Sequence, residues 1–356
     1  MKNLVIFCDG TWNKADQAVD GVLCPTNVVR MGYRVANRNG DVPQIVYYDQ
    51  GVGTGNKLDK LVGGAVGEGL KENVFQAYRF LVSNYESGDQ IFLIGFSRGA
   101  YTARSVAGMI RKCGILKREV VEKYLEAIAL YRHRAIHPDD STAVTFRIEN
   151  AVDGSQPTPI QMVAVWDTVG ALGVPDVWFG GFDAKKMNFF DVTLSGIVKH
   201  AYHAVAIDEE RGKFEPTLWH GRPKPGQILE QVWFCGVHSD VGGGYKVHQL
   251  SDIALEWLIE RAGRAGLAFD SKVMASHPYT SNPLGMLHKS RTGMYRLMKR
   301  YRRPIGVMKE GGQVVLDPTQ SLHPSVLERW DNDAGYRPPE LRAYFLRKGD
   351  HRGEAP

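Results

Sequence analysis

The stretch Ile91-Phe92-Leu93-Ile94-Gly95-Phe96-Ser97-Arg98-Gly99 decides the fold. Its four leading apolar residues are typical of a buried strand, and the small residues over 98–111 predict a helix. A G-x-S-x-G sequence lies between the two, where a sharp turn leaves room only for small residues beside an exposed serine. The pattern makes Ser97 the candidate nucleophile. The alternative is a serine that only caps the helix.

Strands and helices are predicted to alternate along the rest of the chain. Short apolar runs predict further strands at 4–8, 44–48, 161–166 and 228–234. Helical spacing or composition predicts helices at 71–85, 120–132, 200–210 and 251–263. This alternation is typical of an α/β protein with a mainly parallel central sheet flanked by helices. We therefore expect an α/β-hydrolase-like fold with helical insertions or a small cap.

The chain of 356 residues is long for one simple domain. The strand signal fades after Gly244. We predict an α/β-hydrolase core over 1–250, with a possible cap insertion at 172–226. A C-terminal helical or irregular extension, 251–356, is expected to pack on that core.

Composition excludes several classes of protein. The net charge of +5 is too small to indicate nucleic-acid binding, and no apolar run approaches the length of a membrane span. The apolar start is too short for a secretion signal, so we expect a cytoplasmic protein, with signal-less export left open. The four cysteines lack metal-site spacing, so free buried thiols are expected, with no metal and no cofactor.

Polar residues directly after predicted strands are the ones to consider for chemistry, because ligands bind at the carboxyl ends of parallel strands. Asp167 follows the strand 161–166, and His238 comes just after 228–234. A serine nucleophile needs a base, and in hydrolases of this type an acid and then a histidine follow the serine in chain order. Asp167 and His238 fit that order. The alternatives are Asp240 as the acid and His323 as the base.

The stretch Asp9-Gly10-Thr11 follows the first predicted strand, so its N–H groups lie near the same edge of the sheet. An oxyanion hole needs the N–H of the residue after the nucleophile, here Arg98, and one from a neighbouring loop. Gly10 or Thr11 is the candidate for the second donor. A tight turn without catalytic duty, or a metal held by Asp9 and Asp240, would explain the same residues.

Residues 286–303 combine apolar side chains with a dense group of basic ones: Lys289, Arg291, Arg296, Lys299, Arg300, Arg302 and Arg303. On a helix, the apolar residues Met294, Leu297, Met298 and Tyr301 would share one face. Such a segment can lie on an anionic membrane surface. Ordinary packing against the hydrolase core is the alternative.

Together these motifs resemble a bacterial and fungal family of uncharacterised α/β-hydrolase domains that includes phospholipase effectors delivered by type VI secretion. The likeness rests on residues 7–13 (FCDGTWN), 95–104 (GFSRGAYTAR), 165–170 (VWDTVG), 203–209 (HAVAIDE), 233–245 (WFCGVHSDVGGGY) and 323–326 (HPSV). The resemblance implies a Ser-His-Asp hydrolase that cleaves carboxylic esters, including phospholipid acyl esters in the secreted members.

The first functional hypothesis is therefore a serine hydrolase of carboxylic esters whose substrate is an ester or a lipid. A second is a non-catalytic protein that keeps the fold to bind a partner. A third is metal-assisted phosphoester hydrolysis with Asp9 and Asp240. Labelling by a fluorophosphonate separates the first two hypotheses, and sensitivity to chelators would identify the third.

Overall fold

The structure is a computed structural model that describes residues 1–10, 13–51, 63–169, 193–293, 296 and 300–354. Within these residues, eight strands form the central sheet. In spatial order they are β12 (Gln320–Leu322), β9 (Ile228–Phe234), β8 (Val198–Ala206), β7 (Ile160–Trp166), β6 (Gln90–Phe96), β1 (Asn3–Cys8), β5 (Val42–Asp49) and β4 (Arg38–Asn39). All neighbours pair in parallel except β4 and β5. The predicted α/β class with a mainly parallel sheet is confirmed.

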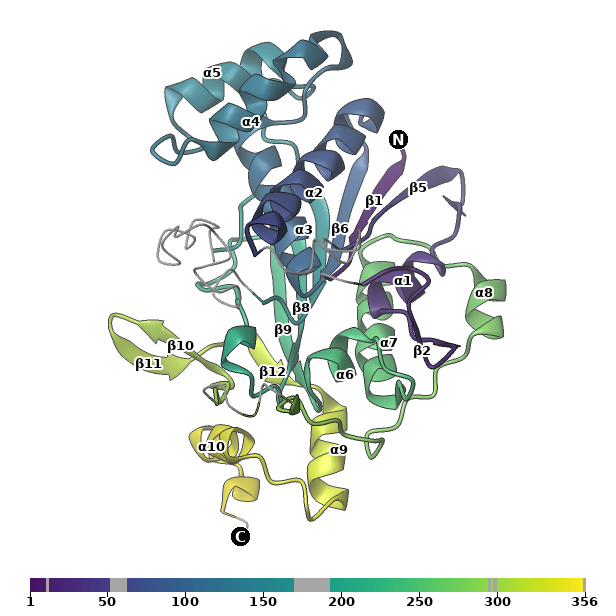
Figure 1. The fold of residues 1–356 in the computed structure, drawn as a ribbon. Helices are drawn as coiled ribbons and strands as arrows, with labels where there is room; N and C mark the ends of the chain where they lie inside the picture. Colours follow the sequence, from purple (N-terminus) through teal and green to yellow (C-terminus); the bar gives the residue numbers. More distant parts are fainter. Residues whose placement is uncertain (11–12, 52–62, 170–192, 294–295, 297–299, 355–356) are drawn as a thin grey trace.

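Helices cover both faces of the sheet (Figure 1). One face carries α2 (Gly63–Asn84), α3 (Arg98–Cys113), the 3-10 helix η1 (Arg118–Lys123), α4 (Tyr124–Arg132) and α5 (Ser141–Asn150). The other carries α1 (Asn27–Gly32), α6 (His238–Gly242), α7 (Gln249–Arg264) and α8 (Ser271–Ser276). The remaining elements are β2 (Ala18–Val19), β3 (Val22–Leu23), η5 (Gly212–Phe214), β10 (Val307–Glu310), β11 (Gln313–Leu316), α9 (Pro324–Asn332), α10 (Pro339–Lys348) and η7 (His351–Gly353).

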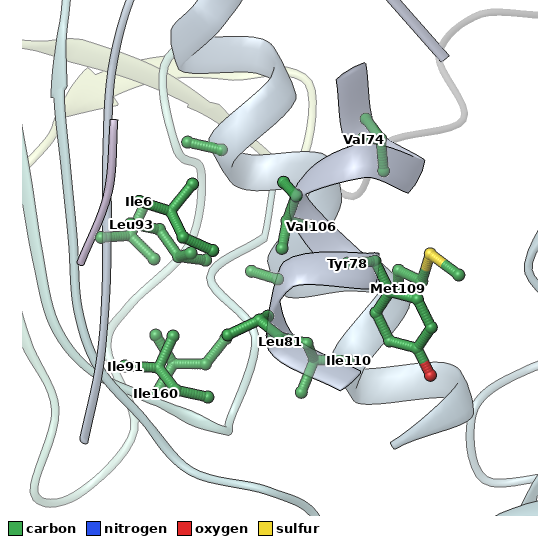
Figure 2. Close-up of a cluster of buried hydrophobic side chains, with 14 of the residues drawn as sticks. Ile6, Val74, Tyr78, Leu81, Ile91, Leu93, Val106, Met109, Ile110 and Ile160 are labelled. Atoms are coloured by element: carbon green, nitrogen blue, oxygen red, sulfur yellow. The ribbon is translucent and has the colours of Figure 1, made fainter. Parts of the chain in front are cut away.

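The first strand shows why the sheet is buried on both faces. Successive side chains of a strand point to opposite faces, so Leu4 and Ile6 lie in one core and Val5 and Phe7 in the other. Figure 2 shows the first core, in which strand residues such as Ile6 face α2 and α3. A strand without a polar face reads as a continuous apolar run, which is how these strands look in the sequence.

The C-terminal residues contribute to the same sheet. Strand β12 pairs in parallel with β9 at one edge. A third apolar cluster lies there, in which Trp233 of β9 packs with Trp330 of α9 and Phe345 of α10. Among the described residues, no helix is both long enough and apolar enough to cross a bilayer. All four cysteines are free and buried, as predicted.

One predicted element is wrong. Residues 200–210 were predicted to be helical, but β8 spans Val198–Ala206 in the middle of the sheet. The five residues from Ala201 to Val205 are all buried, because helices cover both faces of this strand. A short apolar run that is buried on both sides carries no alternation that would tell strand from helix.

Candidate active site

The register of the sheet places Ser97 and Asp167 side by side. Phe96 of β6 pairs with Trp166 of β7, and each candidate residue follows its member of that pair. The Ser97 N–H donates to the Trp166 carbonyl at 3.1 Å, and the Asp167 N–H donates to the Ala204 carbonyl at 2.7 Å. Both residues therefore lie at the carboxyl edge of the parallel strands, where sites form in such sheets.

Ser97 has an unusual backbone conformation between β6 and α3. Its φ is 58° and its ψ is −122°, a region that non-glycine residues rarely adopt and that is found at functional sites. Two glycines permit the turn. A Cβ on Gly95 would lie 2.5 Å from the Gly99 carbonyl oxygen, and one on Gly99 would lie 2.1 Å from the Cys8 carbonyl oxygen. The G-x-S-x-G spacing thus follows from backbone crowding.

The structure brings Asp167 and His238 together. His238 is the first residue of α6, which begins shortly after β9. Its Nδ1 lies 2.6 Å from Asp167 Oδ2. The ring of Phe96, which directly precedes Ser97, packs against the imidazole with 4.5 Å between ring centroids. The imidazole therefore contacts the residue next to the candidate nucleophile.

Burial and charge set the protonation of this pair. Burial alone would raise the pKa of Asp167, but the charge of Arg303 and the bond to His238 hold that pKa well below its usual range. Burial lowers the pKa of His238 and outweighs the opposing effect of Asp167. At neutral pH the pair is thus a carboxylate and a neutral imidazole, which is the form that a general base requires.

Arg303 is a residue of this site that the sequence prediction placed elsewhere. Its side chain is fully buried, and its Nη1 and Nη2 lie 2.6 Å and 3.1 Å from Oδ1 and Oδ2 of Asp167. The sequence analysis grouped Arg303 with the basic side chains of a segment that could lie on a membrane surface, and for this buried residue that contact is wrong. Nothing in the local sequence distinguishes it from its exposed neighbour Arg302.

Residues 209–214 form the wall beside His238. The Phe214 ring packs edge-on against the imidazole at 5.0 Å, and Glu209 Oε2 accepts the His238 N–H at 3.3 Å. Glu209 is held in turn by Arg211, with Nε and Nη2 at 2.9 Å and 2.8 Å from its two oxygens. The sequence indicated Glu209 only as part of a family motif, and gave no role to Phe214.

His203 supports the residue after Asp167. It is fully buried in β8, and its Nε2 accepts the N–H of Thr168 at 3.0 Å. Burial lowers the pKa of His203 to about 3, so the ring is neutral and can accept. His203 thus supports the backbone next to Asp167.

The loop after β1 lies against Ser97. A Cβ on Gly10 would lie 3.2 Å from Ser97 Cβ and 2.6 Å from Asn13 Nδ2, so a larger residue would displace Asn13 and press on Ser97. The Gly10 N–H donates to Asp9 Oδ1 at 2.7 Å. Asp9 Oδ2 accepts from Thr26 and Tyr48, and burial raises the pKa of Asp9 to about 6.

The candidate oxyanion donors are the N–H of Arg98 and the N–H of Gly10 or Thr11. Arg98, the residue after Ser97, is the first residue of α3, so its N–H belongs to the first turn of that helix. Thr11 lies outside the described residues. The Gly10 N–H, in contrast, already has a partner in this structure.

The alternative acid and base have other partners. Asp240 Oδ1 lies 2.6 Å from His288 Nδ1, and its Oδ2 accepts the N–H of Val237. His323 Nδ1 accepts the Ser325 N–H and so caps α9, while its ring stacks on Phe234 at 4.7 Å. Within the described part of the chain, no three His, Cys, Asp or Glu side chains converge as a metal site would need.

The basic segment is described only in part. Residues 286–292 and 300–303 are not helical, while Met294, Leu297 and Met298 lie outside the described residues. The basic side chains of this segment that the structure shows exposed are Lys289, Arg296, Arg300 and Arg302.

A family model matches residues 2–261 of the chain: the catalytic domain of the Tle1-like phospholipase effectors of the type VI secretion system (T6SS). The chain belongs to this family. The match covers Ser97, Asp167 and His238 and ends well before Arg303. The resemblance stated from the sequence is thereby confirmed.

Individual proteins are more distant. An uncharacterized protein of Saccharomyces cerevisiae, YEL023C, is 27% identical over 241 residues, which are 62% of this chain and 33% of the yeast protein. An uncharacterized protein from Pseudomonas aeruginosa matches in structure with 19% identity and a TM-score of 0.45, covering 79% of this chain and 48% of that one. The structure of the Tle1 effector bound to the VgrG spike of the type VI secretion system matches with 19% identity and a TM-score of 0.42. That match covers 69% of this chain and 51% of the effector chain. The chain thus spans a third to a half of these relatives.

Proposed function

We propose that the protein is a serine hydrolase that cleaves carboxylic esters of lipids through Ser97, His238 and Asp167. One observation carries the proposal. Ser97 occupies a rare backbone conformation between β6 and α3, at the sheet edge where the buried Asp167–His238 pair also lies. In hydrolases a strained strand-to-helix turn presents the nucleophile in this way.

The side chains have distinct roles in this mechanism. Asp167 accepts the Nδ1–H of His238 and so leaves Nε2 as the acceptor. His238 Nε2 takes the hydroxyl proton of Ser97 while Oγ attacks the acyl carbon. The same proton then goes to the leaving alcohol. Water hydrolyses the acyl-serine in the second half of the reaction, with His238 again acting as the base.

The oxyanion hole is proposed to use the N–H of Arg98 and one N–H of the loop after β1. Asp9 Oδ1 accepts the Gly10 N–H in this structure, and Thr11, the other candidate in that loop, lies outside the described residues. The absence of a side chain on Gly10 lets the loop approach Ser97. Each such donor typically contributes about 10²- to 10³-fold to the rate.

Family membership favours a phospholipid acyl ester over a small soluble ester. The experiment compares the wild type and Ser97→Ala on a short p-nitrophenyl ester and on phosphatidylcholine in mixed micelles. We expect release of fatty acid and p-nitrophenol by the wild type and none by the variant. Turnover of the soluble ester alone would move the substrate away from lipids. Equal turnover by both proteins would remove Ser97 from the mechanism.

We further propose that Met286, Lys289 and Arg296, three exposed side chains of the segment 286–303, contact anionic membrane. The exposed Lys289 and Arg296 lie in the same segment as Met286, which is 57% exposed, and such a mixture suits a lipid surface. Lys289→Glu with Arg296→Glu should weaken sedimentation with phosphatidylglycerol vesicles at low salt. The control, Arg118→Glu with Lys123→Glu, changes the net charge equally and should sediment like the wild type. No vesicle binding by the wild type would overturn this contact.

A further inference from the structure

Arg303 lies outside the residues that the family model matches, yet it bonds the carboxylate of the candidate active site. Its exposed fraction is 1%. Nη1 lies 2.6 Å from Asp167 Oδ1 and Nη2 lies 3.1 Å from Oδ2, so one planar group engages both oxygens. A two-point contact of this kind fixes the plane of the carboxylate as well as balancing its charge.

The same guanidinium also binds the wall beside His238. Nη1 donates to the Ala206 carbonyl at 2.8 Å, and Nη2 donates to the Phe214 carbonyl at 2.6 Å. The Phe214 ring packs on the imidazole of His238. Arg303 therefore joins the acid, the end of β8 and the residue that covers the base.

The residues next to Arg303 are hydrogen-bonded to Glu210 and Glu215, at or beside the same segment. The Tyr301 N–H donates to the Glu210 carbonyl at 2.9 Å, and its hydroxyl donates to Glu215 at 2.9 Å. Arg300 forms an ion pair with Glu210, and Ile305 is fully buried. These contacts hold the guanidinium in place before any substrate arrives.

We propose that Arg303 is a positioning residue for ester hydrolysis: it fixes the Asp167 carboxylate and, through Asp167 and Phe214, the orientation of the His238 imidazole. The proposal rests on the proposed function of Ser97, Asp167 and His238. It also means that a residue C-terminal to the matched family domain, residues 2–261, contributes to the active site. A lysine at 303 would keep the charge and lose the two-point contact.

A pH profile separates this role from simple support of the fold. The charged or titratable groups that face Asp167 are His238, Arg303 and His203, and those that face His238 are Asp167, Glu209 and Arg211. The positive charge of Arg303 balances the charge of Asp167, which otherwise favours the protonated form of His238. Its removal should therefore raise the pKa of His238, and the acid limb of kcat/KM should move to higher pH.

The test uses the full chain with Arg303→Met, Arg303→Lys and the exposed control Arg302→Met, each checked for folding by circular dichroism. The readouts are kcat and KM for a p-nitrophenyl ester from pH 4 to 9. For Arg303→Met we expect kcat to fall roughly 10- to 100-fold, because a small misplacement of the base is enough for such a loss. We also expect an unchanged KM and an acid limb at higher pH.

The two other variants sharpen the result. Arg303→Lys should keep the acid limb of the wild type and lose part of kcat, and Arg302→Met should match the wild type. A folded Arg303→Met with wild-type kcat, or with reduced kcat and an unmoved acid limb, would overturn the proposal. If Arg303→Met does not fold, a wild-type kcat in Arg303→Lys would overturn the proposal. Absence of any wild-type turnover would instead contradict the proposed function.

Discussion

His238 Nδ1 lies 2.6 Å from Asp167 Oδ2, and the two residues follow strands β9 and β7, which are separated by β8. The N–H of Ala206, the last residue of β8, donates to Asp167 Oδ1 at 3.0 Å, so the intervening strand also holds the carboxylate. This bond engages Nδ1, so Nε2 is the ring nitrogen of His238 that the proposed mechanism uses to take the proton of Ser97. The acid is thus fixed from three sides: by the base, by the sheet and by Arg303.

Asp167→Asn should lower kcat for a soluble ester by about 10³- to 10⁴-fold, because an amide cannot hold His238 in the tautomer that the reaction needs. It should also lower the free energy of unfolding by about 3–5 kcal/mol, since the buried Arg303 loses its counter-charge. Steady-state kinetics and urea unfolding measure the two effects.

Asp240→Asn is the matched control for that substitution. Asp240 is as buried as Asp167 but bonds His288, so most of the activity should remain. A loss in Asp240→Asn as large as the loss in Asp167→Asn would favour Asp240 as the acid.

Gly10→Ala should lower kcat by roughly tenfold or more while the protein stays folded, because its methyl group would collide with Asn13 and press on Ser97. Gly263→Ala is the control. Gly263 lies in α7 with open space around it, so alanine there should leave kcat unchanged and add up to about 1 kcal/mol to stability. Equal kinetics for the two variants would show that the loop does not need to approach Ser97 closely.

Asp49→Asn should change how stability depends on pH. Burial raises the pKa of Asp49 to about 7, and its Oδ2 has no hydrogen-bond partner among the residues that the structure describes. The folded state therefore holds a proton that the unfolded state releases near pH 4, and ionisation of Asp49 costs stability as the pH rises towards 7. The asparagine variant avoids this cost, so it should exceed the wild type at pH 8 by about 1–3 kcal/mol.

Urea unfolding at pH 5 and at pH 8 measures that difference. The exposed Asp41→Asn serves as the control and should follow the wild type at both values. A difference between Asp49→Asn and the wild type that is the same at both pH values would contradict the assignment.

The sequence predicted most of the features that depend on local pattern. The strand that leads to Ser97, the strands that end before Asp167 and shortly before His238, and the helix after Ser97 all lie within two residues of their predicted bounds. These segments are marked by apolar runs and by glycines that the turn requires. The edge of a parallel sheet then brings their ends together, so the proximity of Asp167 and His238 could be inferred as well.

The features that depend on distant contacts could not be predicted. Arg303 sits in a basic stretch, where a solvated surface is the usual outcome, and its partner Asp167 lies 136 residues away. The pairing of Asp240 with His288 joins residues that are 48 positions apart in the sequence, so it could not be predicted either. The capping role of His323 depends on where α9 begins. Strand β8 was missed because alanines interleave its apolar residues, and alanine favours helix.

The most direct test of the central claim is covalent labelling by a fluorophosphonate, followed by mass spectrometry of the tryptic peptides. The probe reacts only with a serine that a neighbouring base has activated. We expect one adduct, on Ser97, in the wild type, none in Ser97→Ala, and much slower labelling in His238→Ala. An unlabelled wild-type protein that is folded, or an adduct on another serine, would contradict the account.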